Sequence, residues 1–157
     1  MNVIIIGAGI ISYLLEKGYN ILHSDLDAVW LKNPTCFLSM DYDIIASIGT
    51  FPKDVFERIG YTLCMGWIYY SSTNITKDLL KNTLKIKVKD NFDDQRELNR
   101  ELFNNSNYKK LRLKILDQSI VSRDQQHDTN TYVAHPLSPK YIDREKFLKS
   151  RDLWILS

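Results

Sequence analysis

Two short segments that are expected to be strands, separated by a short helical segment, constrain the fold of this chain more than any other feature. Residues 3–6 are a run of Val and Ile, which predicts a buried strand of the parallel type. Residues 10–17 predict a helix that ends at Gly18, because glycine best tolerates the left-handed conformation at a helix end. Residues 19–23 predict a second strand, which leads directly into Asp25-Leu26-Asp27. Ligands of open α/β sheets bind at such strand ends.

The rest of the chain continues the alternation of strands and helices. Further strands are predicted over residues 29–31, 43–48, 66–71, 111–116 and 131–135. Helices are predicted over residues 76–84, 93–103 and 143–150, with a helical turn at 53–58 and with Asp93 and Asp143 as N-caps. No internal repeat or linker divides the chain. We therefore expect one three-layer α/β domain over residues 1–157.

The composition fits a single globular core and indicates no polyanionic partner. The chain has 157 residues, 44% of them hydrophobic, and a net charge of +2. It has no dense block of Lys and Arg with interleaved aromatic residues, so we expect no nucleic-acid partner. The apolar run at residues 3–15 is shorter than the roughly 20 residues of a membrane span, so we expect no membrane segment. Cys36 and Cys64 alone make no disulfide framework.

The two glycines after the first predicted strand give one functional hypothesis. A strand followed by Gly7 and Gly9, with an acid at Asp25 or Asp27, matches the start of a dinucleotide-binding βαβ unit. Ser12 stands where the third glycine of that motif is expected, and the predicted helix is short for such a unit. A dinucleotide-binding protein that holds FAD or NAD through Gly7 and Gly9 is therefore the alternative reading.

The two acids give the leading hypothesis. Asp25 and Asp27 occupy alternate positions of a segment that we expect to be extended, so both carboxylates should leave the same face. Two hard oxygen ligands suit Mg²⁺ or Mn²⁺, whose other positions can be filled by phosphate oxygens and water. The non-functional reading of the same pattern is a pair of solvated acids in a turn.

The residues around these acids resemble a known family. Within residues 14–34, Gly18-Tyr19-Asn20, Asp25-Leu26-Asp27, Trp30 and Asn33-Pro34 match in register the pattern of the nucleotide-diphospho-sugar transferase family. That family includes plant cell-wall xylosyl- and arabinosyltransferases. The resemblance implies a GT-A type, Rossmann-like fold with a mixed, mostly parallel sheet. It also implies metal-dependent transfer of a sugar, with retention, from a nucleoside-diphosphate sugar such as a UDP-sugar to a hydroxyl of a saccharide or protein acceptor.

Two later segments add to the resemblance. Residues 64–71 resemble the family's glycine-led strand beneath the sugar pocket, where Gly66 would let the backbone approach the donor closely. Residues 93–99 are similar to the Asp-Gln-x-x-Leu-Asn motif of retaining GT-A enzymes. By this resemblance Asp94 and Gln95 face the transferred sugar as the catalytic residues. The structural alternatives are a plain core strand for the first segment and a helix N-cap for the second.

A third segment supplies the remaining candidates. Enzymes of this kind commonly have a third metal ligand, a histidine near the C-terminus, followed by a cation that contacts the diphosphate. His135 and Lys140 have that order and a suitable spacing. Imidazole binds Mn²⁺ more readily than Mg²⁺, so we expect Asp25, Asp27 and His135 to hold Mn²⁺, with Mg²⁺ as the alternative. A single histidine after a strand is also common in purely structural roles.

The resemblance covers residues 10–140, whereas family members normally carry a further strand that cradles the nucleotide base. We therefore expect a truncated chain that lacks part of the nucleotide-binding half. Either residues 3–7 replace that strand, or a missing segment or second chain completes the site. A degenerate, non-catalytic transferase domain is the third hypothesis, and we expect weak or absent activity for the isolated chain.

Overall fold

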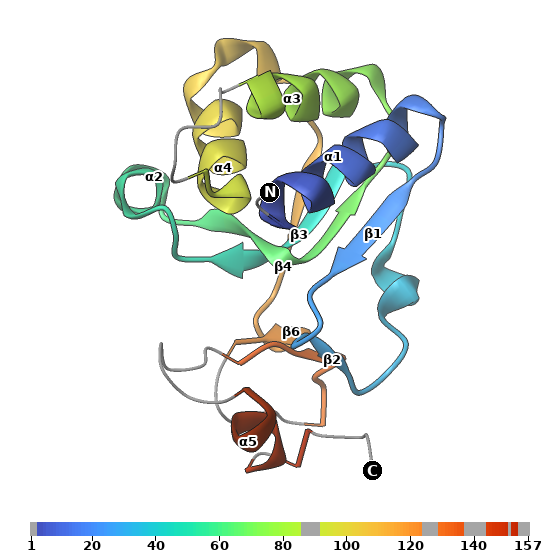
Figure 1. Ribbon diagram of the computed structural model, residues 1–157, viewed down its shortest axis with the longest axis vertical. Helices are drawn as coiled ribbons and strands as arrows, with labels where there is room; N and C mark the ends of the chain where they lie inside the picture. The colour runs from blue at the N-terminus through green and yellow to red at the C-terminus, as the bar shows by residue number, and fades with distance from the viewer. Residues whose placement is uncertain (1–2, 86–91, 124–128, 137–143, 151, 154–157) are drawn as a thin grey trace.

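The computed structural model describes residues 3–85, 92–123, 129–136, 144–150 and 152–153, which form two sheets and a set of helices (Figure 1). The larger sheet has the order β1 (Ile21–Ser24), β4 (Thr62–Tyr70), β3 (Ile44–Gly49) and β5 (Leu113–Leu116). Its β1–β4 and β3–β4 pairs are antiparallel, and its β3–β5 pair is parallel. The sheet is mixed, as predicted, but the prediction of a mostly parallel sheet is wrong. The alternation of strands and helices does not specify strand direction, and the short connection through α2 (Lys53–Ile59) returns the chain antiparallel.

Three helices cover one face of the larger sheet: α1 (Val3–Glu16), α3 (Asn74–Lys85) and α4 (Asp94–Asn104) (Figure 1). Leu15, Leu79 and Leu98 contribute one fully buried side chain from each of these helices. They pack in one cluster with Ile44 and Ile68 of the sheet. This cluster is the main hydrophobic core.

The opposite face is covered by a smaller sheet with the order β2 (Val29–Trp30), β7 (Val133–Ala134) and β6 (Val121–Ser122). Trp67 and Tyr69 alternate along β4 with Ile68 and pack toward Val133 on this side. Helix α5 (Arg144–Lys149) adds Leu148 to a third cluster beyond the smaller sheet. Two 3₁₀ helices, η1 (Pro34–Phe37) and η2 (Ser106–Tyr108), complete the described elements. The second outer layer is thus chiefly a small sheet, so the predicted three-layer arrangement is present only in part.

Helix α1 corrects the prediction for the first residues. Residues 3–6, predicted as a strand, belong to one continuous helix that includes Gly7 and Gly9. Ala8, Ile11 and Leu15 are buried at helical spacing, and this amphipathic contact outweighs the low helix propensity of glycine. A short apolar run does not by itself distinguish a strand from a helix. Gly7 and Gly9 thus lie inside a helix and not in the strand-to-helix loop on which the dinucleotide-binding hypothesis depends.

The other predicted elements are found within a few residues of their expected bounds. Helix α4 begins where predicted, with the Asp93 carboxylate accepting a hydrogen bond of 2.8 Å from the Arg96 backbone N–H. Strand β4 starts four residues earlier than predicted, at Thr62, and is buried throughout. The predicted N-cap Asp143 lies outside the described residues. Among the helices that the structure describes, none has the length and apolar character of a membrane span.

Candidate metal and donor site

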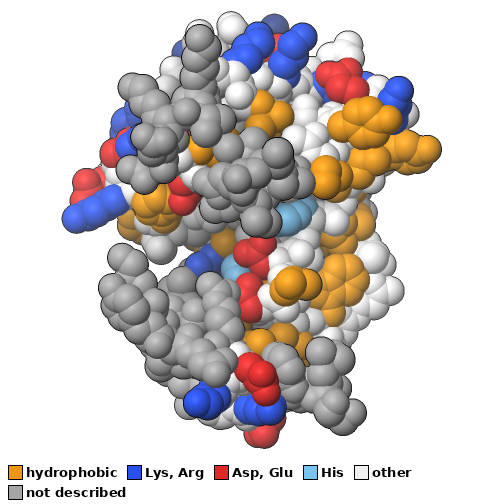
Figure 2. Space-filling view, in the orientation of Figure 1, with side chains coloured by type: hydrophobic (Ala, Val, Ile, Leu, Met, Phe, Trp, Pro, Cys, Tyr) orange, Lys and Arg blue, Asp and Glu red, His pale blue; other side chains and the backbone are white. Residues whose placement is uncertain are grey.

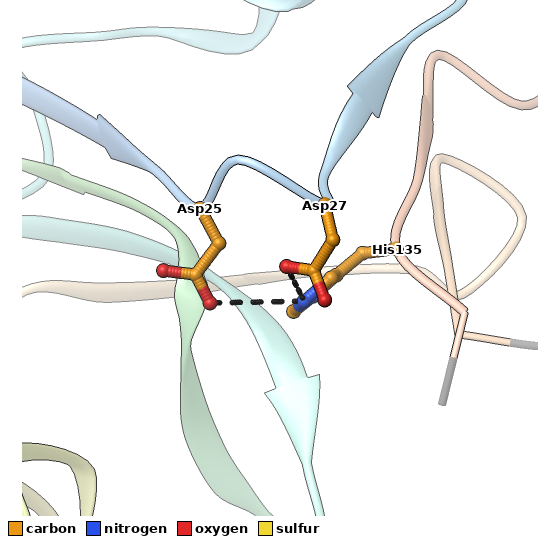
Figure 3. Close-up of side chains that lie close together, drawn as sticks. All are labelled: Asp25, Asp27 and His135. Atoms are coloured by element: carbon orange, nitrogen blue, oxygen red, sulfur yellow. Dashed lines mark ion pairs between the residues drawn. The ribbon is translucent and has the colours of Figure 1, made fainter. Parts of the chain in front are cut away.

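Asp25 and Asp27 lie on a tight turn between β1 and β2. The Asp25 N–H donates to the Gly66 carbonyl at 2.9 Å, and the Ala28 N–H donates to the Asp25 carbonyl at 3.1 Å, which closes the turn. Leu26 is fully exposed at the tip of the turn. The segment is therefore not extended, and that part of the prediction is wrong. The turn, rather than the pleat of a strand, directs both carboxylates toward one side (Figure 3).

His135 reaches the two acids through the smaller sheet. Strand β7 pairs antiparallel with β2 in a register that sets Ala134 opposite Val29, so the next residue lies beside the Asp-x-Asp turn. The backbone N–H of His135 donates to the Ser122 carbonyl at 2.8 Å. The His135 Nε2 lies 3.4 Å from Asp27 Oδ1 and 3.7 Å from Asp25 Oδ2 (Figure 3). The three predicted metal ligands thus lie together.

The geometry of these three side chains fits a divalent cation. One potential ligand atom from each residue lies within 4.8 Å of the other two. Adjacent ligands that are each about 2.1 Å from an octahedral ion stand about 3 Å apart, so the distances of 3.4 and 3.7 Å from His135 to the two carboxylates need only a small contraction. Asp27 and His135 are shielded, with 14% and 10% of their side chains exposed, whereas Asp25 is 46% exposed. An ion here would be held from the protein side and open toward solvent.

Gly66 makes room for the histidine. A Cβ atom at position 66 would stand 1.9 Å from Cε1 and 2.5 Å from Nδ1 of His135. Real side chains do not approach so closely, so the imidazole can occupy this place only above a glycine. The close approach of a donor sugar to Gly66 stays a prediction. Among the described residues, the neighbour that requires a glycine at this position is His135.

A cleft of about 580 Å³ adjoins the Asp-x-Asp turn on the helical side of the sheet. Asp25, Gly66, Asp94 and Gln95, all predicted from the sequence, line it together. Gly7, Ala8 and Ile11 of helix α1 line it as well. Figure 2 shows acidic and histidine side chains side by side near the middle of one face of the molecule. Four of the predicted site residues thus share one cleft.

Asp94 has an altered acidity inside this cleft. Burial raises the pKa of its carboxyl group above the ordinary value of 3.8, and the neighbouring charges of Asp93 and Asp25 raise it further. The backbone N–H of Gln95 and the side chain of His23 act in the opposite direction. A carboxyl group with a raised pKa keeps its proton more readily and can then donate a hydrogen bond to a ligand oxygen.

The Asp-Gln-x-x-Leu-Asn motif also joins α4 to β4. The side-chain oxygen of Gln95 accepts from the Met65 N–H at 3.1 Å, and its amide group donates to the Phe51 carbonyl at 2.9 Å. One turn later, Asn99 accepts from the Leu63 N–H at 2.7 Å and donates to the Leu63 carbonyl at 2.9 Å. Both ends of the Gln95 amide are therefore already engaged with the backbone, although its side chain lines the cleft.

Three residues near the site were not predicted from the sequence. His23 Nε2 lies 3.3 Å from Asp25 Oδ1, and Cys64 Sγ lies 3.9 Å from Nδ1 of His135. The Arg123 guanidinium donates a hydrogen bond to the same sulfur. Burial alone would raise the pKa of the Cys64 thiol, but His135 and Arg123 outweigh it, so the net shift is downward. No spacing rule links these positions, because they lie on separate elements.

The predicted diphosphate contact Lys140 lies outside the described residues. His135, the other residue of the same predicted motif, lies within them.

Comparison with protein families decides the assignment of the chain. A profile of the nucleotide-diphospho-sugar transferases matches residues 8–142, which is most of the length of this chain. The chain belongs to this family. The matched range contains all of the predicted site residues, from Asp25 to Lys140, and agrees with the range over which the resemblance was noted. No curated protein and no solved structure matches this nucleotide-diphospho-sugar transferase.

Proposed function

We propose that this protein is a metal-dependent glycosyltransferase. It transfers a sugar from a nucleoside-diphosphate donor, a UDP-sugar, to a hydroxyl group of a saccharide or protein acceptor, with retention at the anomeric carbon. In the GT-A type site, Asp25, Asp27 and His135 hold Mn²⁺ or Mg²⁺. The convergence of these three side chains beside a cleft, within the family match, carries the proposal.

The chemistry of the ligand set supports this role. Two carboxylates and one imidazole supply three positions, so a six-coordinate ion keeps others for phosphate oxygens and water. A divalent ion so placed supplies Lewis-acid stabilisation of the charge that develops on the diphosphate leaving group. Asp25, the most exposed of the three ligands, also lines the cleft and is suited to contact the donor as well.

The cleft supplies the place for the transferred sugar. Asp94 lies within it, and its raised pKa suits a carboxyl group that exchanges hydrogen bonds with sugar hydroxyls. Gln95 lines the same cleft, and its hydrogen bond with Met65 joins α4 to β4. Gly66 lines the same cleft, and Lys140 contacts the diphosphate.

Titration calorimetry with UDP, with and without Mn²⁺, tests this function. We expect UDP to bind with Mn²⁺ and to bind at least about tenfold more weakly without it, because the ion links the acids to the diphosphate. Asp27→Ala should abolish the Mn²⁺-dependent part. Asp41→Asn is the matched control, since Asp41 is an exposed acid that contacts Ser39 outside the site. A thermal-shift screen of nucleotide sugars with Mn²⁺ then identifies the donor.

Two outcomes would contradict the proposal. Equal UDP affinity with and without Mn²⁺ would show that the ion takes no part in donor binding. Failure of the unaltered protein to bind Mn²⁺, UDP or any nucleotide sugar would favour the degenerate, non-catalytic domain.

A further inference from the structure

The buried thiol of Cys64 lies directly behind the imidazole of His135. Cys64 is on β4, 2% exposed, and its sulfur lies 3.9 Å from His135 Nδ1, on the side of the ring away from Asp25 and Asp27. We propose that Cys64 is a positioning residue, whose sulfur accepts a hydrogen bond from Nδ1–H of His135 and so directs the Nε2 lone pair toward the ion position. The inference rests on the proposed function, in which Nε2 binds the cation.

Arg123 defines the role of the sulfur. A guanidinium group has only hydrogen-bond donors, and the NH1 group of Arg123 points at Cys64 Sγ. The sulfur therefore acts as a hydrogen-bond acceptor toward Arg123. An acceptor beside Nδ1 favours the ring form with its proton on that nitrogen. In the neutral ring, Nε2 is then the atom with a free lone pair, which is the form that a metal ligand needs.

The other contacts of His135 locate the ring but do not select its proton position. The backbone N–H of His135 is bonded to the Ser122 carbonyl, and the ring lies over Gly66. Both contacts would be the same for either tautomer. Cys64 is the described residue that faces Nδ1, so it distinguishes the two nitrogens.

The competing reading treats Cys64 as a small core residue without influence on His135. The two readings differ in a quantity that can be measured without any metal. Long-range ¹H–¹⁵N NMR of the full chain reports which ring nitrogen carries the proton. The measurement is made at about pH 9, which is above the pKa of about 6.5 of a free imidazole.

We expect the unaltered protein to carry the His135 proton on Nδ1, and Cys64→Ala to lose this preference. The dissociation constant for Mn²⁺, measured by calorimetry, should rise about 10- to 100-fold in Cys64→Ala, the usual effect of removing a group that orients a metal ligand. Cys64→Ser retains an acceptor oxygen and should keep the proton on Nδ1. Cys36→Ala is the matched control, because Cys36 is exposed and its sulfur contacts the Asn33 carbonyl.

An unchanged tautomer in Cys64→Ala would overturn the inference, even if the protein became less stable. If Cys64→Ala does not fold, Cys64→Ser decides: a proton on Nε2 in that variant would also overturn it. Failure of the unaltered protein to bind Mn²⁺ would instead contradict the proposed function, while the tautomer measurement would still decide the role of Cys64.

Discussion

The imidazole of His135 lies so close to the backbone of Gly66 that a methyl group at position 66 would overlap it, with 1.9 Å between the added Cβ and Cε1 of the ring. Gly66 is on β4 of the larger sheet and His135 follows β7 of the smaller one. This contact is one of the points at which the two sheets meet, and it places the proposed third metal ligand.

Gly66→Ala should therefore displace the His135 ring while leaving most of the fold intact. We expect the dissociation constant for Mn²⁺ to rise at least about tenfold, because one of three protein ligands moves. Calorimetry gives the affinity, and circular dichroism reports the secondary structure. Unchanged Mn²⁺ affinity in a folded Gly66→Ala protein would show that His135 is not a ligand.

Gly9→Ala is expected to act in the opposite direction. Gly9 lies inside helix α1, and an added Cβ would meet nothing within 4 Å. Alanine has a higher helix propensity than glycine, so the free energy of unfolding should rise by about 0.5–1 kcal/mol. Urea denaturation measures it. A loss of stability would contradict the continuous helix and would favour a glycine loop at this position.

Asp43 should make the stability of the fold depend on acid pH. Burial alone would raise the pKa of Asp43, but hydrogen bonds from Arg112 and Thr73 outweigh it and hold the pKa below its ordinary value of 3.8. A carboxyl group with a lowered pKa in the folded state contributes stability above its unfolded value. That contribution is lost as the pH falls below about 3.8 toward the lower folded value.

The substitution Asp43→Asn tests this contribution. It removes the charge that accepts three hydrogen bonds from Arg112, at 2.8, 3.0 and 3.1 Å, and should cost about 1–3 kcal/mol at pH 7. The variant should also lose part of the pH dependence of unfolding in the acid range. Asp54→Asn is the control, because its ion pair with Arg100 is exposed and should matter much less. Equal effects at the two positions would contradict the prediction.

Asn99 is expected to be essential for stability. Its fully buried side chain satisfies both the N–H and the carbonyl of Leu63, and Asn99→Leu would leave these two backbone groups unpaired. We expect a loss of about 2–4 kcal/mol in the free energy of unfolding. Asn107→Ala, at an exposed position, should change it by less than about 0.5 kcal/mol. Comparable losses in the two variants would show that the Asn99 contacts are not specific.

The residues of the site could be predicted from the sequence where their side-chain types indicated a role and the pairing of the strands brought them together. Asp25, Asp27 and His135 were expected as ligands, and they lie together because the short strands on either side of the site pair in one register. Asp94 and Gln95 were expected at the same place and line the cleft. Their roles in catalysis and donor binding stay predictions.

The errors have local physical causes. Residues 3–6 favour a strand by composition, but they belong to helix α1, which packs on the main core through Ile11 and Leu15. The Asp-x-Asp segment forms a turn because the chain passes there from one sheet to the other, which no residue pattern within the segment specifies. Cys64 and Arg123 could not be linked in advance, because only the packing of the smaller sheet against β4 brings them to His135.

The smaller sheet is held by very short ladders, since β2, β6 and β7 have two residues each. Ladders of this size make few hydrogen bonds, so opening of this region is expected to cost much less free energy than global unfolding. The proposed ligands lie on both sides of the β2–β7 contact, Asp25 and Asp27 before β2 and His135 after β7. A bound ion would therefore act as a crosslink of this layer: amide hydrogens of β7 would exchange slowly with the ion bound, and quickly once a chelator removes it.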